Sequence, residues 1–216
     1  MVCFHLNYVR HGDSLGFLLT HSMHKDILVI YFHTGISGGG KSTIAGKLLQ
    51  KWSAKHQGEG ISGTIKGTEE ETLERHIIEL ARRERVEVDY VNTRELLTVF
   101  VKKLREKTEK PTFIILDDLE GSFDHVFGSL LDLACTHSLD RFRVVITMQN
   151  GQEVTKYDDE FELLEVTGFS QSEATRYLSQ IPQDRISDVL AVVSHLPLAL
   201  AALKGDLKSN CVSANC

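Results

Sequence analysis

The sequence predicts an α/β fold in which a parallel sheet is flanked by helices and is followed by the start of a small helical subdomain. Short apolar runs without polar alternation occur along the first three quarters of the chain, as is typical of strands buried on both faces of a parallel sheet. Segments with apolar residues at helical spacing lie between these runs and also follow the last one. This alternation of strands and helices indicates a parallel α/β sheet, and the helical patterns after it indicate a second, smaller unit.

Five short runs are expected to form the strands of the sheet. The run at 61–65 is the weakest of them because glycines bracket it. In chain order the runs are Ile27–Phe32, Ile61–Ile65, Thr112–Leu116, Phe142–Met148 and Phe161–Val166.

Helical periodicity fills the segments between and after these runs. The segment 41–56 places Ile44, Leu48 and Trp52 on one apolar face that can lie against the sheet. Further helices are expected within 73–81, 96–104, 124–135 and 186–193. Ser170 and Glu173 form a capping-box pattern that opens another helix, and Pro197 suits the first position of a final one.

A glycine-rich loop lies between the first strand and the first helix. Residues 35–42 read Gly-Ile-Ser-Gly-Gly-Gly-Lys-Ser and match the pattern G-x-x-x-x-G-K-S in the strand–loop–helix context that it requires. Backbone N–H groups of such a loop converge on phosphates, and the helix that follows adds the positive end of its dipole. The sequence therefore predicts a P-loop NTPase core that binds ATP or ADP together with Mg²⁺.

Each residue of the loop has an expected role. Lys41 should reach the β- and γ-phosphates, the Ser42 hydroxyl should ligate Mg²⁺, and the Thr43 amide should support the α-phosphate. The residues expected to hold the nucleotide are Gly35, Ser37, Gly38, Gly39, Gly40, Lys41, Ser42 and Thr43. An ordinary glycine turn is the alternative, and the complete pattern disfavours it.

Two aspartates end the apolar run at 113–116. Asp117 is expected at the carboxyl edge of the sheet, where ligands of open α/β sheets bind, and we assign it to Mg²⁺ through a water molecule. Asp118 is the candidate catalytic residue, since a carboxylate near the γ-phosphate can orient or polarise the attacking water. Both aspartates could instead cap the turn after the strand, an alternative that is most open for Asp118.

Polar residues also follow the run at 142–148. Thr147, Gln149 and Asn150 occupy the position from which many P-loop ATPases sense the γ-phosphate. An ordinary turn at the end of a strand is an equally good interpretation of these residues.

The motifs divide the chain into three expected parts. Residues 1–26 show neither a helical nor a strand period and are treated as an N-terminal extension. Residues 27–168 are expected to form the P-loop nucleotide-binding domain, and residues 169–216 a partial helical subdomain with a tail.

Composition and charge limit the partners that are expected. The net charge of -6 and the lack of a basic stripe favour a chain with no nucleic-acid partner. The apolar runs are too short to span a bilayer, so no membrane association is expected. The 4 cysteines are too sparse for a disulfide scaffold, which favours a reducing, cytoplasmic location.

Taken together, four segments resemble the NB-ARC branch of the STAND nucleotide-binding switch proteins, which includes plant disease-resistance proteins and apoptotic protease-activating factors. The segments are the loop 35–43, the acidic strand 113–119, the strand 144–147, and the Leu-Pro-Leu-Ala-Leu sequence at 196–200. The first two motifs are common to many P-loop proteins, whereas the last is more particular to this family. The resemblance spans about residues 27–203.

The resemblance implies roles for residues beyond the loop. In the family, the proline equivalent to Pro197 packs beside the adenine from a small helical subdomain. An arginine that senses the γ-phosphate normally follows the strand that here ends in Thr147-Met148-Gln149, and this chain lacks it. His195 replaces the glycine that usually precedes the leucine and proline. The resemblance thus implies nucleotide binding, and these departures from the family favour weak or no hydrolysis.

The sequence therefore predicts an ADP/ATP-binding regulatory switch domain of a signalling protein, with protein partners or self-association. Slow ATPase activity is compatible with this function. The alternative is a small-molecule kinase of the nucleoside type, because such kinases begin with a similar Gly-Ile-Ser-Gly loop. A third interpretation is a degenerate scaffold that no longer binds nucleotide, which the intact Lys41, Ser42 and Asp117 disfavour.

Overall fold

The computed structural model describes residues 29–34, 37–57, 59–88, 92–120, 126, 128, 130, 142–149, 162–166, 168–179, 186–188, 190–191 and 195–202. Its elements are, in order, β1 (Val29–Thr34), α2 (Lys41–His56), β2 (Ile61–Lys66), α3 (Glu70–Arg83), α4 (Thr93–Lys107), β3 (Thr112–Asp117), β4 (Phe142–Thr147), β5 (Glu162–Glu165) and α6 (Gln171–Tyr177). The expected N-terminal extension lies outside the described residues, as does most of the helix expected at 124–135.

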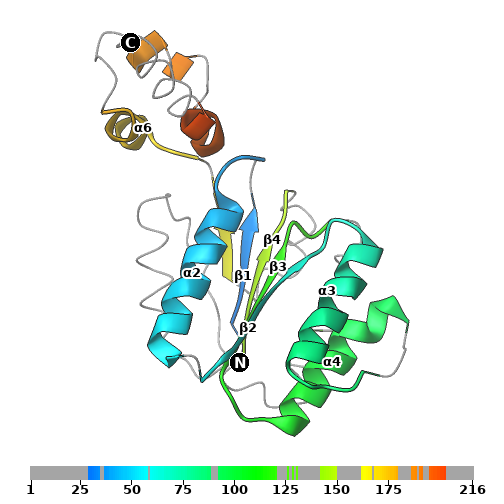
Figure 1. Cartoon of the computed structure of the whole chain (residues 1–216). Coiled ribbons are helices and arrows are strands. Elements are labelled where there is room, and N and C mark those ends of the chain that lie inside the picture. Colours follow the sequence, from blue (N-terminus) through cyan, green and yellow to red (C-terminus); the bar gives the residue numbers. More distant parts are fainter. Residues whose placement is uncertain are drawn as a thin grey trace, which may run out of the picture.

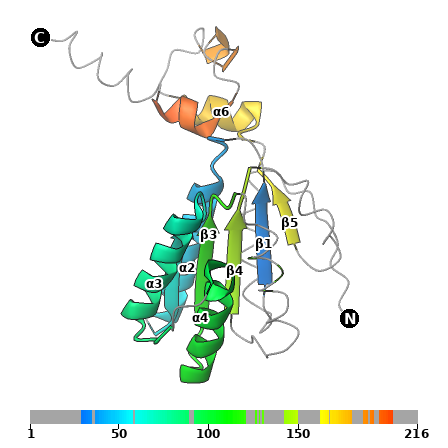
Figure 2. The ribbon, with the colours of Figure 1, turned by 90° about the vertical axis from the view of Figure 1, so that its right-hand side faces the viewer.

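The strands form one parallel 5-stranded sheet in the order β2-β3-β4-β1-β5 (Figures 1 and 2). All five expected runs are strands, including the weak one at 61–66, so the predicted fold class is confirmed. The chain runs outward from β1 to β2, returns through β3 and β4, and then places β5 on the other side of β1. Such a change of direction opens a ligand site at the carboxyl ends of the strands in α/β sheets.

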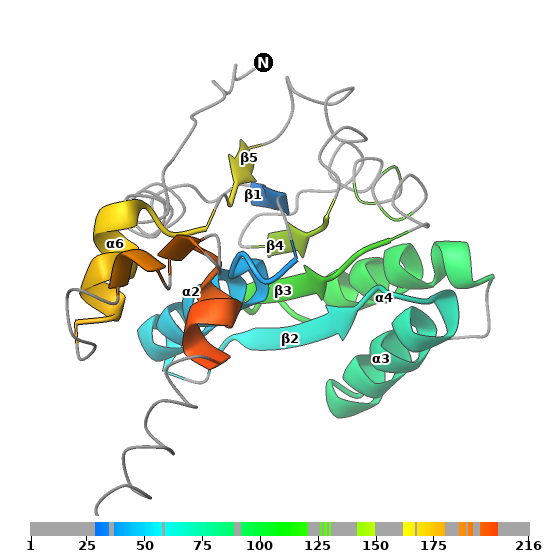
Figure 3. The same ribbon diagram turned by 90° about the horizontal axis from the view of Figure 1, so that it is seen from above.

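Both faces of the sheet are covered, which explains the unalternating apolar strands. Along β3, Ile114 and Leu116 belong to the core that α3 and α4 cover, whereas Phe113 and Ile115 belong to the core under α2. The helices α3 and α4 accordingly lie on one side of the sheet and α2 on the other (Figures 1 and 3). Neighbouring side chains of a strand point to opposite faces, so a strand buried on both faces must be apolar throughout.

Helix α2 connects the glycine loop to the base of the sheet. It begins after Gly40 and ends before Gln57, as the sequence predicts. Ile44, Leu48 and Trp52 are buried along its length. The Trp52 ring lies 5.6 Å from the Phe113 ring between centroids, which locks the last turns of α2 onto β3.

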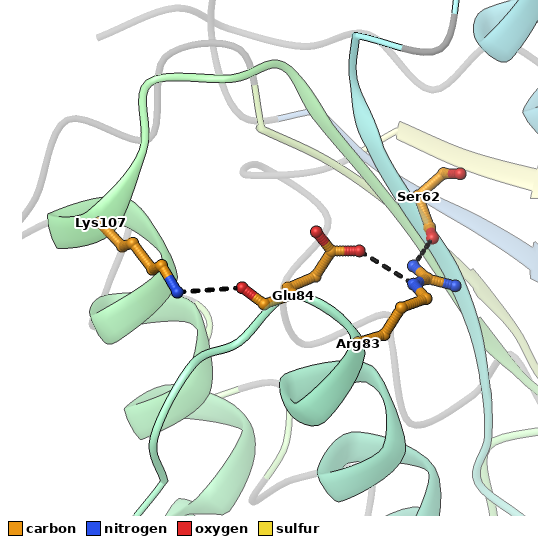
Figure 4. Close-up of polar contacts among 4 residues, drawn as sticks. All are labelled: Ser62, Arg83, Glu84 and Lys107. Atoms are coloured by element: carbon orange, nitrogen blue, oxygen red, sulfur yellow. Dashed lines mark hydrogen bonds and ion pairs between the residues drawn. The ribbon is translucent and has the colours of Figure 1, made fainter.

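Polar contacts fasten the end of α3 to its neighbours (Figure 4). The Arg83 guanidinium donates to the Ser62 carbonyl on the edge strand β2, and its Nε donates to the Glu84 carboxylate at 2.9 Å. Lys107 of α4 donates to the carbonyls of Glu84, at 3.2 Å, and Arg85. The exposed ion pair itself adds little stability, but the lysine satisfies carbonyls that the helix end leaves free.

A separate small core holds the helical part of the chain. Helix α6 begins with the expected capping box: Ser170 accepts from the Glu173 N–H at 3.3 Å, and the Ser170 N–H donates to the Glu173 carboxylate at 2.8 Å. The core consists of Ala174, Leu178, Ile186, Leu190 and Leu200. Pro197 opens the expected last helical segment, and α6 and this segment lie beyond the end of the sheet at which the strand arrows point (Figure 2).

Candidate functional site

The glycine loop bridges the carboxyl end of β1 and the first turn of α2. Gly38 and Gly40 have φ angles of 79° and 99°, a left-handed conformation that glycine adopts without strain. Gly40 is the N-cap of α2, and no side chain caps the helix there. The backbone N–H groups of this turn are therefore suited to a phosphate ligand. The expected binding residue Gly35 lies outside the described residues.

The residues of the loop and of the first turn of α2 differ in their exposure to solvent. Ser42 and Thr43 are exposed in the first turn of α2, where the Ser42 hydroxyl is accessible as an oxygen ligand. Ser37 is exposed as well, whereas Gly39 is buried. The chemistry of these groups fits a phosphate with its cation, since Mg²⁺ takes one or two protein oxygens together with phosphate oxygens and water.

Lys41 is the buried cation of the site, with 6% of its surface exposed. Burial lowers the pKa of its ammonium group below the ordinary 10.5, and the carboxylates of Asp118 and then Asp117 oppose this shift. The three side chains predicted from distant motifs are therefore close enough to interact. A phosphate placed beside Lys41 would add a further negative charge that favours the protonated ammonium.

Thr147 connects the two aspartates at the end of β3. Its hydroxyl donates to Asp117 Oδ1 at 2.7 Å and accepts the backbone N–H of Asp118 at 2.8 Å. Its carbonyl accepts the Leu119 N–H at 2.9 Å. Thr147 is 0% exposed and its aspartate partners are half-buried, so these part-buried bonds hold the acidic turn against the end of β4.

The conformation of Asp118 is itself unusual. Its φ angle of 58° places a non-glycine residue in the left-handed region, which asparagine and aspartate tolerate better than most residues. Asp118 and Asp117 are both half-buried. Their proposed roles in hydrolysis and metal binding remain predictions, and the charges of both carboxylates act on the pKa of Lys41.

Gly67 supports the acidic turn from the next strand, a role that the sequence did not indicate. The Gly67 N–H donates to the Asp117 carbonyl at 2.8 Å, and the Gly67 carbonyl accepts the Glu120 N–H at 3.2 Å. A Cβ atom at this position would lie 2.5 Å from Leu119 Cδ1 and 3.1 Å from Leu119 Cα. A larger residue here would force Leu119 to shift, and the only sign of this role in the sequence was a single glycine after a weak strand.

The three candidate γ-phosphate sensors have different positions. The Thr147 hydroxyl is fully buried and donates its only proton to Asp117. Gln149 is exposed just beyond the end of β4, and Asn150 lies outside the described residues. Thr147 is thus part of the support of the acidic turn, whereas a sensing role for Gln149 remains a prediction.

The last helical segment contacts the glycine loop directly. The Leu198 N–H donates to the Gly38 carbonyl at 3.3 Å. A Cβ atom on Gly38 would lie 3.3 Å from Leu198 Cβ. Pro197, expected to pack beside the adenine, is half-buried, whereas Leu198 is 67% exposed. Leu198 thus contacts the loop, and the packing of Pro197 beside the adenine remains a prediction.

His195, which precedes this helical segment, lies close to Gly168. The His195 carbonyl accepts the Phe169 N–H at 3.1 Å, and a Cβ atom on Gly168 would lie 3.3 Å from the same carbonyl. His195 has a φ angle of 61°. Glycine would adopt this left-handed conformation with less strain than histidine does.

Comparison with solved structures supports the fold. The chain superposes on the Aeropyrum pernix ORC1 protein in complex with DNA with a TM-score of 0.62 and 14% identity, covering 94% of this chain and 61% of that one. The Aeropyrum pernix ORC2 protein in ADPNP-ADP complexes superposes with a TM-score of 0.54 and 13% identity, covering 93% of this chain and 63% of that one. Drosophila ORC bound to DNA superposes with a TM-score of 0.54 and 17% identity, covering 92% of this chain and 52% of that one. No family model and no curated protein matches the sequence.

These structures and the motif geometry define the class of the protein: the chain has the fold of a P-loop NTPase. It spans about half to three fifths of the length of these neighbours, at 61%, 63% and 52%. The likeness extends to the fold alone, and the NB-ARC assignment remains a prediction. No helix among the described residues is long and apolar enough to cross a membrane.

The comparison corrects one expectation, namely that the chain has no nucleic-acid partner. Two of these neighbours are described as bound to DNA. The expectation rested on a net charge of -6 for the whole chain. A total charge does not describe how charges are distributed over a surface, so it cannot exclude a local contact with phosphates.

Proposed function

We propose that the chain is an ADP/ATP-binding regulatory switch domain with weak or no hydrolysis. The observation that carries this proposal is the hydrogen bond between Leu198 and Gly38, because it links the helical subdomain to the phosphate loop. A ligand that changes the loop then also changes how the helices dock on the sheet. Coupling of this kind is what a nucleotide-dependent switch requires.

The expected nucleotide site uses residues from three parts of the fold. The loop 35–43 would hold the phosphates through backbone N–H groups and Lys41, and Pro197 would lie beside the adenine. Ser42 and Asp117 would hold Mg²⁺, which neutralises phosphate charge when bound. The left-handed glycines and the buried lysine support this assignment.

Weak hydrolysis follows from what surrounds the expected γ-phosphate. Asp118 is our candidate for orienting the attacking water. No arginine follows Met148 in the next positions of the sequence, and the Thr147 proton is donated to Asp117. Among the residues that the structure describes, the end of β4 therefore offers no free donor beside Gln149 to stabilise charge that develops on the γ-phosphate.

Binding measurements test the proposal. Isothermal titration with ADP and with ATP, each with Mg²⁺, should give binding to the intact chain and a large loss of affinity in Lys41→Ala. Equal affinity in the two proteins would contradict the assignment of the loop. Mass spectrometry of nucleotide carried through native purification is a direct second measurement.

A nucleoside-type kinase is the alternative that the loop sequence also allows. ATP turnover that appears only when a nucleoside is added would favour the kinase over the switch.

We further propose that the protein is cytoplasmic and acts through protein partners or through self-association. Sedimentation of the chain with and without ADP would detect the self-association.

Contact with DNA is a second candidate function, and the DNA-bound neighbours favour it. Fluorescence anisotropy with a labelled duplex at low and physiological salt tests it, because binding through phosphates weakens steeply as salt rises. No change in anisotropy at low salt would reject this function for the chain. The same titration with DNA should be repeated in the presence of ADP and of ATP.

A further inference from the structure

We propose that Thr147 is a positioning residue that orients the Asp117 carboxylate toward Mg²⁺, and that its hydroxyl does not sense the γ-phosphate. This inference rests on the proposed nucleotide site. It assigns to the end of β4 a role different from the one that its place in the sequence suggests.

The direction of the hydrogen bonds carries the first step. A threonine hydroxyl has one proton, and here the proton is directed to Asp117 Oδ1 at 2.7 Å. A phosphate oxygen is an acceptor, so it would need the same proton. The Thr147 hydroxyl therefore cannot donate to phosphate while it holds Asp117.

The second step concerns the orientation of the carboxylate. Because Oδ1 of Asp117 is held by the buried hydroxyl, rotation about the last side-chain bond is restricted. The other oxygen, Oδ2, is then presented in a fixed direction. Partners that fix a metal-binding carboxylate in this way commonly change metal affinity when they are removed.

The third step concerns Asp118. Its backbone N–H donates to the same Thr147 oxygen at 2.8 Å, while its own φ angle is 58°. The bond thus stabilises a left-handed residue directly after the metal-binding aspartate. One hydroxyl on β4 fixes both the side chain of Asp117 and the backbone of Asp118.

The test compares Thr147→Val, which removes the hydroxyl with little change in shape, with Thr147→Ser, which retains it. Thr98→Val is the matched control, because the Thr98 hydroxyl is buried on α4 and has no hydrogen-bond partner among the described residues. The first measurement is amide hydrogen exchange in the nucleotide-free protein. The Asp118 and Leu119 amides should exchange roughly 10-fold faster in Thr147→Val, the order expected when a buried hydrogen bond is lost. They should exchange at wild-type rates in Thr147→Ser and Thr98→Val.

The second measurement is the ratio of ADP affinities with and without Mg²⁺, repeated with ATP. In Thr147→Val we expect this ratio to fall by roughly 10-fold for both nucleotides, as for the loss of other groups that orient metal ligands. The affinity without Mg²⁺ should stay near that of the wild type, which a general loss of folding would not allow. Thr147→Ser should restore most of the ratio.

The outcomes separate this inference from the proposed function. An unchanged Mg²⁺ ratio in Thr147→Val, in a wild type that binds ADP, would overturn only the positioning role. A loss confined to ATP would also overturn it, because that is the result for a γ-phosphate sensor. A wild type that binds neither nucleotide would remove the proposed function and the inference together.

Discussion

Gly38 has a left-handed backbone conformation and also lies close to Leu198, and glycine meets both conditions without strain. Its φ angle of 79° is left-handed, and its backbone lies against Leu198. A side chain here would strain the loop and press on the helical segment that contacts it. At the residue scale, the phosphate loop is therefore shaped by its neighbours as well as by its ligand.

Gly38→Ala should lower the free energy of unfolding by about 1–2 kcal/mol, the cost of a left-handed conformation for an L-residue. Gly46→Ala is the matched control, because Gly46 is in α2 and a Cβ atom added there would have nothing within 4 Å. It should raise stability by roughly 0.5–1 kcal/mol. Urea unfolding followed by Trp52 fluorescence, from the single tryptophan of the chain, measures both. Equal effects in the two variants would contradict the strained role of Gly38.

The lowered pKa of Lys41 predicts a pH dependence. Between the lowered folded value and 10.5, the unfolded chain binds more protons than the folded chain, so Lys41 makes stability rise with pH over this window. Phosphate binding favours the protonated form, so nucleotide affinity should fall, and proton uptake on binding should increase, as pH rises through the same window.

Titration calorimetry in buffers of different ionisation enthalpy measures the uptake of protons. Lys41→Arg is the control, since arginine stays charged at all accessible pH values. If it binds ADP, its binding should show no proton uptake that increases with pH. If ADP binding to the wild type released protons, and released more of them as the pH rose, the assigned position of Lys41 beside the phosphates would be contradicted.

At the scale of elements, the sequence predicted features that depend on local patterns better than it predicted contacts between distant residues. Helix α2 begins at Lys41 and ends at His56 as expected, because glycines and apolar spacing are local properties. Strand β1 extends to Thr34, two positions beyond the apolar run, because pairing with β5 continues through polar residues. The bond between Thr147 and Asp117 was not predicted, since no local pattern reports which residues of neighbouring strands meet.

The junction at His195 gives a prediction for the helical elements. His195→Gly should leave stability unchanged or raise it by up to about 1 kcal/mol, because glycine adopts the left-handed φ angle without strain. His195→Val should lower it by roughly 1–2 kcal/mol, since a β-branched residue tolerates this conformation poorly. Differential scanning calorimetry of the two variants tests the prediction. A more stable valine variant would show that the conformation at 195 is not left-handed.

At the scale of the whole molecule, the sequence predicted the fold class but not how the two units touch, and the set of site residues stays a prediction. The sheet carries two cores, and the helical unit has its own. The contact between Leu198 and Gly38 joins residues far apart in the chain. A Leu-Pro-Leu pattern indicates a helix start, but nothing in it specifies which of its residues reaches the loop.

This contact predicts how nucleotide binding should spread through the molecule. Leu198→Pro removes the donating N–H at a helix start that tolerates proline, whereas Leu198→Ala removes the side chain and keeps the N–H. With ADP at about 100 times its dissociation constant, the wild type should be stabilised by about 2.7 kcal/mol. Hydrogen exchange should show part of this protection in both units of the wild type and of Leu198→Ala.

In Leu198→Pro, ADP should still protect the sheet and α2, but the protection of α6 should fall toward its nucleotide-free level. This result would show that the helices respond to the phosphate loop through the hydrogen bond donated by residue 198. Equal protection of α6 in the two variants would show that coupling passes through the Leu198 side chain or through other contacts. Absence of ADP protection throughout the wild type would instead contradict nucleotide binding itself.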